Sequence, residues 1–177
     1  MVKKNILFIM SSLRNGGAER SLVNLLQLLD YDKYNVDLLL FQNEGMFLKQ
    51  VPDEVNVISN FDKLHILYDN KRVVSIKYPY LSAIHIIGTF VSRQKTNTLS
   101  QSRQYRWKHF YKQNVPTLTK FYDVAIAYMQ REQTYFLVDK VKATKKIAWV
   151  HNEYSQLGHF REIDLEYFEK IDKVVTI

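Results

Sequence analysis

Short apolar runs alternate with amphipathic segments along most of this sequence, and this alternation constrains the fold more than any other feature. Continuous apolar runs are typical of strands buried on both faces, whereas apolar residues spaced three and four apart are typical of helices. Strands that alternate with helices favour a mostly parallel sheet covered by helices on both faces. We therefore expect an α/β fold, a Rossmann-like three-layer α/β/α domain. The predicted strands are 5–10, 35–41, 55–59, 123–128, 145–150 and 172–177, and the predicted helices are 17–29, 132–141 and 156–170, with helical segments across 61–120 that are broken near Pro79 and across 92–102.

The composition agrees with one globular domain and excludes several classes of protein. The 177 residues are 46% hydrophobic and 24% charged, a balance far from that of disordered chains. Cysteine is absent, which excludes a disulfide scaffold, a cysteine nucleophile and a thiolate zinc site within this sequence. The most apolar long window, 73–91, contains Lys77, Pro79 and His85 and is a poor membrane span. We expect a soluble protein.

Positive charge is concentrated in the middle of the sequence. The formal net charge is +7, and residues 71–122 contain no Asp or Glu. Basic residues interleaved with aromatic ones are typical of surfaces that meet anionic lipid head groups, and they also suit single-stranded nucleic acid. A solvated basic surface whose aromatic residues point into the core is the third interpretation. The candidate surface residues are Arg93, Lys95, Arg103, Arg106, Trp107, Lys108 and Lys112.

Two predicted loops follow strands at the edge of the sheet where parallel α/β folds bind their ligands. The first contains Gly16 and Gly17 directly before a predicted helix, and such glycines let a ligand phosphate approach the helix N-terminus. This spacing is neither the dinucleotide fingerprint nor a Walker loop, so a tight turn explains it equally well. In the second loop, His151 is the histidine best placed to contact a sugar or a phosphate, although a lone histidine is more often structural. Motifs for metal binding and for a serine nucleophile are absent from the sequence.

Taken together, several segments resemble glycosyltransferase family 4. They are Gly16-Gly17-Ala18-Glu19-Arg20 after the first strand, residues 34–40, residues 121–127, Trp149-Val150-His151-Asn152 and residues 172–177. The resemblance covers both ends of the sequence and leaves the basic middle unmatched. It implies a GT-B fold, in which two Rossmann-like domains face each other across a cleft. Residues 1–177 would be the N-terminal, acceptor-binding domain, with a basic helical insertion at about 61–120.

The resemblance also implies roles for individual residues. Gly16 and Gly17, with Ala18 and Glu19, would form the loop at the donor diphosphate and the acceptor. His151 would lie near the transferred sugar and be catalytic, and the neighbours of the site would be Arg14, Asn152 and Glu153. The donor would be a UDP- or GDP-sugar, and transfer would retain the anomeric configuration without requiring a metal.

The family's nucleotide-binding half carries a Glu-x7-Glu motif that residue 177 does not reach. We therefore expect the C-terminal nucleotide-sugar-binding domain to be missing from this sequence, and the chain by itself to be inactive. The resemblance favours an anionic membrane surface as the partner of residues 71–122. It places the enzyme in the cytoplasm at the inner face of the membrane, acting on a lipid-linked cell-surface polysaccharide. The alternatives are a non-catalytic α/β module that binds nucleic acid or membrane, and an inactive transferase-like interaction domain.

Overall fold

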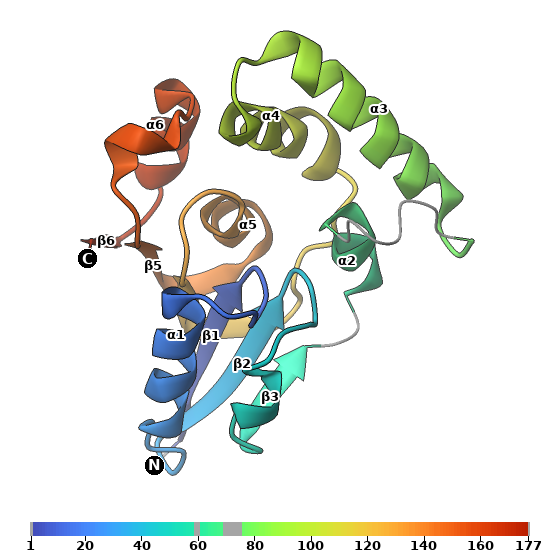
Figure 1. The fold of residues 1–177 in the computed structure, drawn as a ribbon. Coiled ribbons are helices and arrows are strands. Elements are labelled where there is room, and N and C mark those ends of the chain that lie inside the picture. Colours follow the sequence, from blue (N-terminus) through green and yellow to red (C-terminus); the bar gives the residue numbers. More distant parts are fainter. Residues whose placement is uncertain (1, 59–60, 69–75, 177) are drawn as a thin grey trace.

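The computed structural model describes residues 2–58, 61–68 and 76–176, and these residues form a parallel sheet between layers of helices (Figure 1). Within them the sheet has six strands in the order β3-β2-β1-β4-β5-β6, which is the Rossmann order. Every neighbouring pair of these strands is parallel, so the predicted Rossmann-like α/β fold is confirmed. The strands are β1 (Lys4–Met10), β2 (Tyr34–Leu40), β3 (Val55–Ile58), β4 (Phe121–Ala127), β5 (Lys142–Val150) and β6 (Lys173–Thr176).

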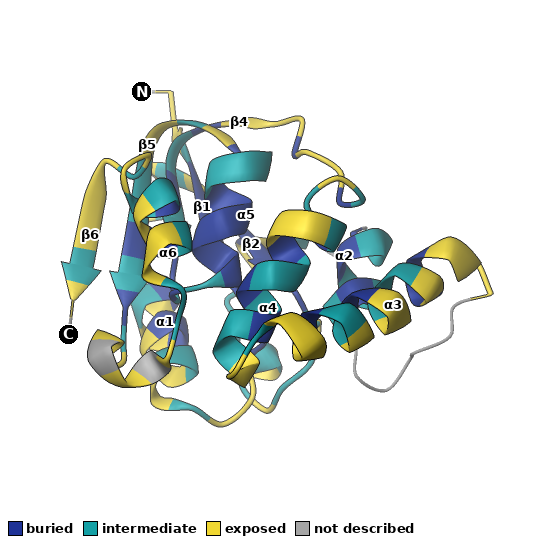
Figure 2. Cartoon of the chain, turned by 90° about the horizontal axis from the view of Figure 1, so that it is seen from above, coloured by how far each residue is buried: buried dark blue, intermediate teal, exposed yellow. Residues whose placement is uncertain are grey.

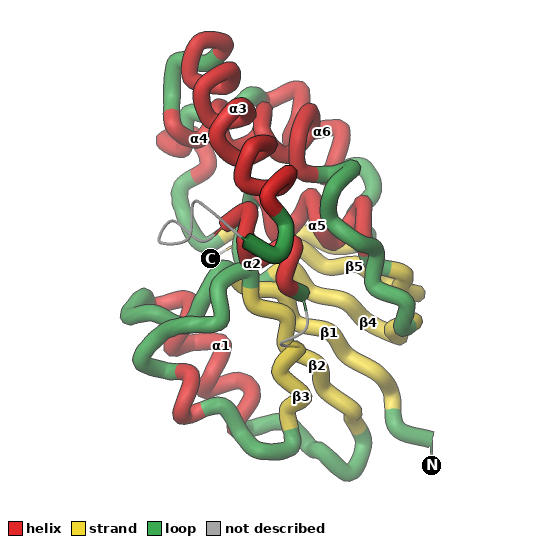
Figure 3. The backbone as a smooth tube through the Cα atoms, turned by 90° about the vertical axis from the view of Figure 1, so that its right-hand side faces the viewer, coloured by secondary structure: helices red, strands yellow, loops and turns green. Residues whose placement is uncertain are grey.

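Helices cover both faces of the sheet, as the tube view shows (Figure 3). One face carries α1, and the other carries α5 with α2 and the other helices from the middle of the chain. The α-helices are α1 (Gly17–Gln27), α2 (Asp62–Tyr68), α3 (Pro79–Lys95), α4 (Leu99–Arg106), α5 (Glu132–Lys140) and α6 (Arg161–Phe168). Three short turns of helix complete the described chain: the 3₁₀ turns η1 (Leu48–Gln50) and η3 (Tyr154–Leu157) and the π turn η2 (Trp107–Tyr111).

From Ile6 to Met10, strand β1 is apolar because its two faces lie in two different cores. Leu7 and Ile9 pack under α5 and α2, whereas Phe8 and Met10 pack under α1. A strand buried on both faces needs an apolar residue at every position, which explains the continuous run in the sequence. The same holds for the carboxyl half of β2, where Leu38, Leu39 and Leu40 are all fully buried.

In the described part of the basic middle of the chain, α3, α4 and η2 form a layer of helices at the carboxyl edge of the sheet (Figure 1). Helix α3 starts at Pro79, as expected for a proline at a helix start, and ends at Lys95, inside the predicted break at 92–102. Helix α4 begins after Thr98, whose side chain accepts a hydrogen bond from the backbone N–H of Gln101. The exposed end of α3 projects from the molecule (Figure 2). None of the helices in the described part of the chain is both long and apolar enough to cross a membrane.

The predicted continuous helix at 156–170 is wrong. The chain instead forms the turn η3, passes through Gly158 in the left-handed conformation (φ 59°) and begins α6 only at Arg161. The side chain of Gln104 on α4 accepts a hydrogen bond from the Phe160 backbone N–H at 2.6 Å. A side chain from another helix thus bonds to a backbone N–H that a continuous helix would have used. The local sequence pattern does not predict such a contact.

Candidate functional site

A polar pocket of about 340 Å³ lies at the carboxyl edge of the sheet. The strand order places β1 and β4 side by side, and the chain leaves them toward opposite edges of the sheet. Ligands of open parallel sheets bind at such a switch point. The pocket is lined by Ser11, Ser12, Arg14, Glu19, Phe41, Gln42, Leu67, Tyr68, His85, Leu99, Arg103, Arg106, Tyr111, Glu132 and Gln133.

The floor and the roof of the pocket come from different parts of the chain. The ends of β1 and β2 supply Ser11 and Gln42 to the floor, whereas the helices of the basic middle supply the roof. Helix α2, which also lines the pocket with Leu67 and Tyr68, contacts the sheet through His65, whose Nε2 lies 3.1 Å from the carbonyl oxygen of Leu40 at the end of β2. The basic middle is therefore part of the candidate site as well as part of the surface.

Glu132 at the start of α5 is the most buried charged group of the pocket. Arg103 Nε lies 2.5 Å from its Oε1, and Arg131 Nε lies 3.9 Å from its Oε2. Burial acts to raise the pKa of Glu132, but the charges of Arg103 and Arg131 outweigh it and lower the pKa below its ordinary value. Glu132 is thus held as a carboxylate at the N-terminus of a helix, where the dipole also favours negative charge.

Arg131 adopts a strained backbone directly before α5, with φ at 76° and ψ at −126°. Residues other than glycine rarely take this conformation, and the strain costs on the order of 1–3 kcal/mol. Such residues cluster at binding sites, where the surrounding structure holds them in place. Arg131 directly precedes Glu132, the first residue of α5, which lines the pocket.

Gly16 caps the N-terminus of α1, and its neighbour Glu19 folds back over it. A Cβ at Gly16 would lie 2.1 Å from Glu19 Oε2, so position 16 has no room for a side chain while Glu19 stays in place. A Cβ at Gly17, by contrast, would have no described atom within 4 Å. Ala18 follows in the first turn and is half-buried.

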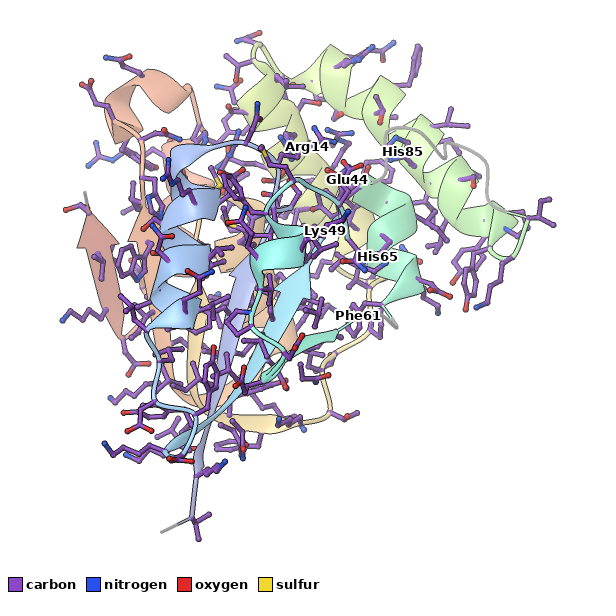
Figure 4. The ribbon with its side chains drawn as sticks, turned by 60° about the horizontal axis from the view of Figure 1, so that its bottom comes forward. Arg14, Glu44, Lys49, Phe61, His65 and His85 are labelled. Atoms are coloured by element: carbon purple, nitrogen blue, oxygen red, sulfur yellow. The ribbon has the colours of Figure 1, made fainter. Side chains whose placement is uncertain are left out.

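The loops after β1 and β2 are joined beside this helix start. Arg14 forms an ion pair with Glu44, and the two side chains lie close together in Figure 4, with His85 of α3 nearby. Gly45 has φ at 135°, and a Cβ there would lie 1.9 Å from the Leu13 carbonyl carbon. This close approach lets the β2 loop hold Arg14 at the pocket.

His151 follows β5, as predicted, and is held by the aromatic residues around it. Its ring lies 5.7 Å from the Trp149 ring and 5.2 Å from the Tyr128 ring, and its backbone N–H donates to Gln130 Oε1 at 3.2 Å. Its Nε2 is buried without a hydrogen-bond partner among the described residues. Burial lowers the pKa of His151, although a hydrogen bond to the Tyr128 backbone and the charge of Glu19 partly offset this.

Glu19 lines the pocket and its charge acts on His151, whereas Gly16, Gly17 and His151 are not among the residues that line it. The other predicted site residues of the loop after β5 do not line the pocket either. Asn152 and Glu153 are exposed, and Glu153 Oε2 accepts a hydrogen bond from Gln156 at 2.5 Å.

The structure divides the predicted basic surface into three groups. Arg93 and Lys95 are exposed at the end of α3, whereas Arg103 and Arg106 line the pocket. The remaining lysines pair with acidic residues of later helices, Lys108 with Glu166 and Lys112 with Asp139, both at 2.7 Å. Lys71 and Arg72 lie outside the described residues.

The prediction that Trp107 lies on the membrane or acceptor surface is wrong. Its side chain is fully buried, and its Nε1 donates a hydrogen bond to Asp139 Oδ2 at 2.9 Å. The ring packs against Phe136 of α5, with 6.2 Å between ring centroids. Trp107 therefore belongs to the core between the basic middle and α5, and it is not available to a membrane or an acceptor.

Sequence reasoning missed Glu132 and Gln133, although a signal for them exists. They follow the loop at the carboxyl end of β4, which lies next to β1 at the switch point. Ligands of parallel sheets bind beyond the carboxyl ends of the strands, which is why the loops after β1 and β5 are candidates. The loop after β4 becomes a candidate for the same reason once the strand order is known. Tyr68 and Tyr111 carry no such signal, because only helix packing brings them to the pocket.

Across residues 2–58, 61–68 and 76–176, no group of three or more His, Asp or Glu is placed to hold a metal ion. A comparison with protein-family models gives no match for this chain, and neither does a comparison with curated protein sequences.

Proposed function

We propose that this chain is the acceptor-binding half of a retaining glycosyltransferase with a GT-B fold. The enzyme transfers a sugar from a UDP- or GDP-sugar to a growing, lipid-linked cell-surface polysaccharide, and no metal is required. The observation that carries the proposal is the polar pocket at the switch point, which is lined by Glu19 of α1, and the charge of Glu19 also acts on His151. The likeness of Gly16-Gly17 and His151 to glycosyltransferase family 4 supports the same assignment.

The start of α1 suits a diphosphate. The first turn of a helix presents unpaired N–H groups and the positive end of the dipole. No described atom lies within 4 Å of where a Cβ of residue 17 would stand, whereas the Glu19 carboxylate lies over Gly16. A leaving nucleoside diphosphate would gain from both the hydrogen bonds and the dipole.

His151 suits a contact with the transferred sugar. Its lowered pKa keeps the imidazole neutral near pH 7, and its Nε2 has no partner among the described residues. A neutral imidazole can accept or donate one hydrogen bond, which matches a sugar hydroxyl. The Trp149 ring, which stacks on the imidazole, and the tilted Tyr128 ring fix its orientation.

The pocket suits a sugar acceptor. Its volume of about 340 Å³ falls within the range of small-molecule sites, roughly 300–1,000 Å³. Its lining combines amide and carboxylate side chains, those of Gln42, Gln133 and Glu132, with the aromatic side chains of Tyr68 and Tyr111. This polar and aromatic lining differs from the mostly apolar lining of a lipid-binding cavity.

The exposed face of α3 suits an anionic membrane surface. Ile86, Ile87 and Phe90 are 51%, 54% and 64% exposed, and they share one side of the helix with Tyr80. Arg93 and Lys95 follow on the last turn, and the region 71–122 has no acidic residue that would repel lipid phosphates. Each Lys or Arg near an anionic bilayer contributes about 1 kcal/mol. This contact would bring a lipid-linked acceptor to the pocket.

The test of the proposal is transfer by the complete enzyme, of which this chain would be the N-terminal half. We expect His151→Ala to reduce transfer of label from a nucleotide-sugar to membrane acceptor by about a hundredfold or more, as for loss of a positioned proton-transfer or hydrogen-bonding group. Gly16→Val should also reduce transfer steeply, because a side chain there displaces Glu19. Asn24→Ala, on the exposed side of α1, is the matched control. Near-normal transfer by both site variants, with unchanged melting temperatures, would contradict the proposal.

A further inference from the structure

The corner of the pocket around Arg106 carries a positive charge that the described acidic residues do not match. Glu132 is flanked by Arg103 and Arg131, and Glu44 pairs with Arg14. The carboxylate of Glu19 lies over Gly16 at the start of α1. Arg106 makes no ion pair with any described carboxylate, so its positive charge is available to a ligand in the pocket.

The contacts of Arg106 hold the guanidinium in place without using all of its donors. Nη1 donates to Thr89 Oγ1 at 3.0 Å and lies 3.5 Å from the Tyr111 hydroxyl, and the group lies 5.8 Å from the Tyr111 ring centroid. Nε is buried and lacks a hydrogen-bond partner among the described residues. A guanidinium fixed on one side by neutral partners is prepared to bind an anion on the other.

Two neighbouring groups complete this corner. The Tyr68 hydroxyl is also buried without a partner in the described part of the chain, and the charges of Arg106 and Glu132 both act on it. His85 lies 2.9 Å from the Tyr111 hydroxyl through its Nδ1, and burial together with the charge of Arg106 lowers its pKa. His85 is therefore neutral near pH 7, and the corner presents one fixed guanidinium and one hydroxyl.

We propose that the acceptor sugar bound in this pocket carries a negatively charged group, a carboxylate or a phosphate, and that Arg106 binds it. The inference rests on the proposed function, which makes the ligand of this pocket an acceptor sugar. The charge and the unused donors at Arg106 select an anion over a neutral hydroxyl, because a neutral ligand leaves the guanidinium unmatched. The Tyr68 hydroxyl donates a further hydrogen bond to the same anion.

The test measures binding of small sugars to the chain as it is, by NMR titration at pH 7. The probes are glucose, glucuronate, glucose 1-phosphate and inorganic phosphate. We expect one of the two anionic sugars to bind about tenfold to a hundredfold more tightly than glucose, the range expected for one charge-assisted hydrogen-bonded contact. Tighter binding of glucuronate identifies a carboxylate, and tighter binding of glucose 1-phosphate identifies a phosphate. Equal binding of glucose and both anionic sugars would overturn the inference, as would inorganic phosphate binding as tightly as either.

Variants then assign the anion to Arg106. Arg106→Gln should remove the preference for the anionic sugar, and Tyr68→Phe should weaken it severalfold. Lys142→Gln removes the same charge at the opposite end of the sheet and should change nothing. A preference that survives in folded Arg106→Gln would overturn the assignment. If that variant does not fold, Arg106→Lys is the substitute, because it keeps the charge without the planar guanidinium. It should still weaken binding of the anionic sugar, and an unchanged preference would overturn the assignment to Arg106.

The two proposals can fail separately. If His151→Ala abolishes transfer by the complete enzyme while glucose and the anionic sugars bind equally, only the anion inference fails. If the anionic sugars bind through Arg106 while the complete enzyme transfers nothing, the proposed function fails and the anion site remains.

Discussion

At the scale of single residues, the candidate site depends on a glycine, a carboxylate and a histidine from two separate loops. Gly16 leaves the space that Glu19 occupies, and the charge of Glu19 reaches His151. Burial nevertheless dominates at His151 and keeps its pKa below the ordinary value. Glu19 thus links the helix start to the histidine, a link that neither loop reveals alone.

This link predicts how His151 titrates. We expect its ring Cε1–H resonance to titrate with a midpoint below 6.5, because burial disfavours the charged imidazolium. Since the folded pKa lies below the unfolded one, the unfolded state binds the proton more readily. The free energy of unfolding therefore decreases as pH falls from the unfolded pKa to the folded pKa. Glu19→Gln should move the midpoint lower still, because it removes a negative charge that raises the pKa. Glu153→Gln, in the loop after β5, is the control and should leave the midpoint where it is; a rise with Glu19→Gln would refute the link.

At the scale of elements, α3 combines a packed side with an apolar side that no other described element covers. Leu81 and Gly88 are buried against the rest of the helical layer, and a Cβ at Gly88 would lie 3.1 Å from the Phe110 ring. On the other side Ile86, Ile87 and Phe90 are largely exposed. A helix of this kind, with basic residues in its last turn, resembles an interfacial membrane helix.

The exposed side of α3 should decide whether the chain binds vesicles. We expect co-sedimentation with vesicles of anionic lipid but not with neutral ones, and weaker binding at high salt. The double variant Ile87→Ser with Phe90→Ser should reduce binding at least tenfold, because burying each side chain is worth about 1.5–3 kcal/mol. Leu28→Ser is the control, since Leu28 is 84% exposed at the end of α1. Equal loss in the control, or equally strong binding to single-stranded oligonucleotides, would contradict the membrane assignment.

At the scale of the whole molecule, buried carboxylates tie the helices above the sheet to one another. Glu132 joins α5 to α4 through Arg103. Asp164 of α6 accepts hydrogen bonds from the side chains of Tyr135, Tyr154 and Gln104 and contacts His159. Burial acts to raise the pKa of Asp164, but the hydrogen bonds to His159, Tyr135 and Tyr154 outweigh it and lower the pKa. Both groups therefore stabilise the fold as carboxylates.

These two carboxylates predict sensitivity to acid. Because their folded pKa values lie below the unfolded ones, their stabilisation is complete above about pH 5 and is lost as pH falls through the folded values. We expect urea unfolding at pH 7, 5, 4 and 3 to show a falling free energy of unfolding below pH 5. Glu132→Gln should flatten this fall, while Glu54→Gln, an exposed carboxylate near β3, should not. A slope unchanged by Glu132→Gln would show that the Arg103–Glu132 pair contributes no net stability.

Much of the fold follows from local sequence patterns. Strands β1, β2, β4 and β5 lie within a few residues of the predicted ranges, because strands inside a parallel sheet need continuous apolar runs. The start of α1 after Gly16 follows from the glycine pair, and the position of His151 follows from the apolar strand before it. Each of these predictions depends on a few consecutive residues, and so the sequence alone could support it.

Tertiary structure decided the rest of the site. Arg103 and Glu132 are 29 positions apart, and Gln104 and Asp164 are 60 apart, so only the packing of α4 against α5 and α6 brings them together. The same packing buries Trp107, although its neighbours in the sequence are basic and aromatic. The sequence by itself determined which segments become strands and which loops lie at the carboxyl edge, because hydrophobic periodicity is local. Which charges remain unpaired in the pocket was decided by the fold, because pairing depends on distances between segments that the sequence keeps apart.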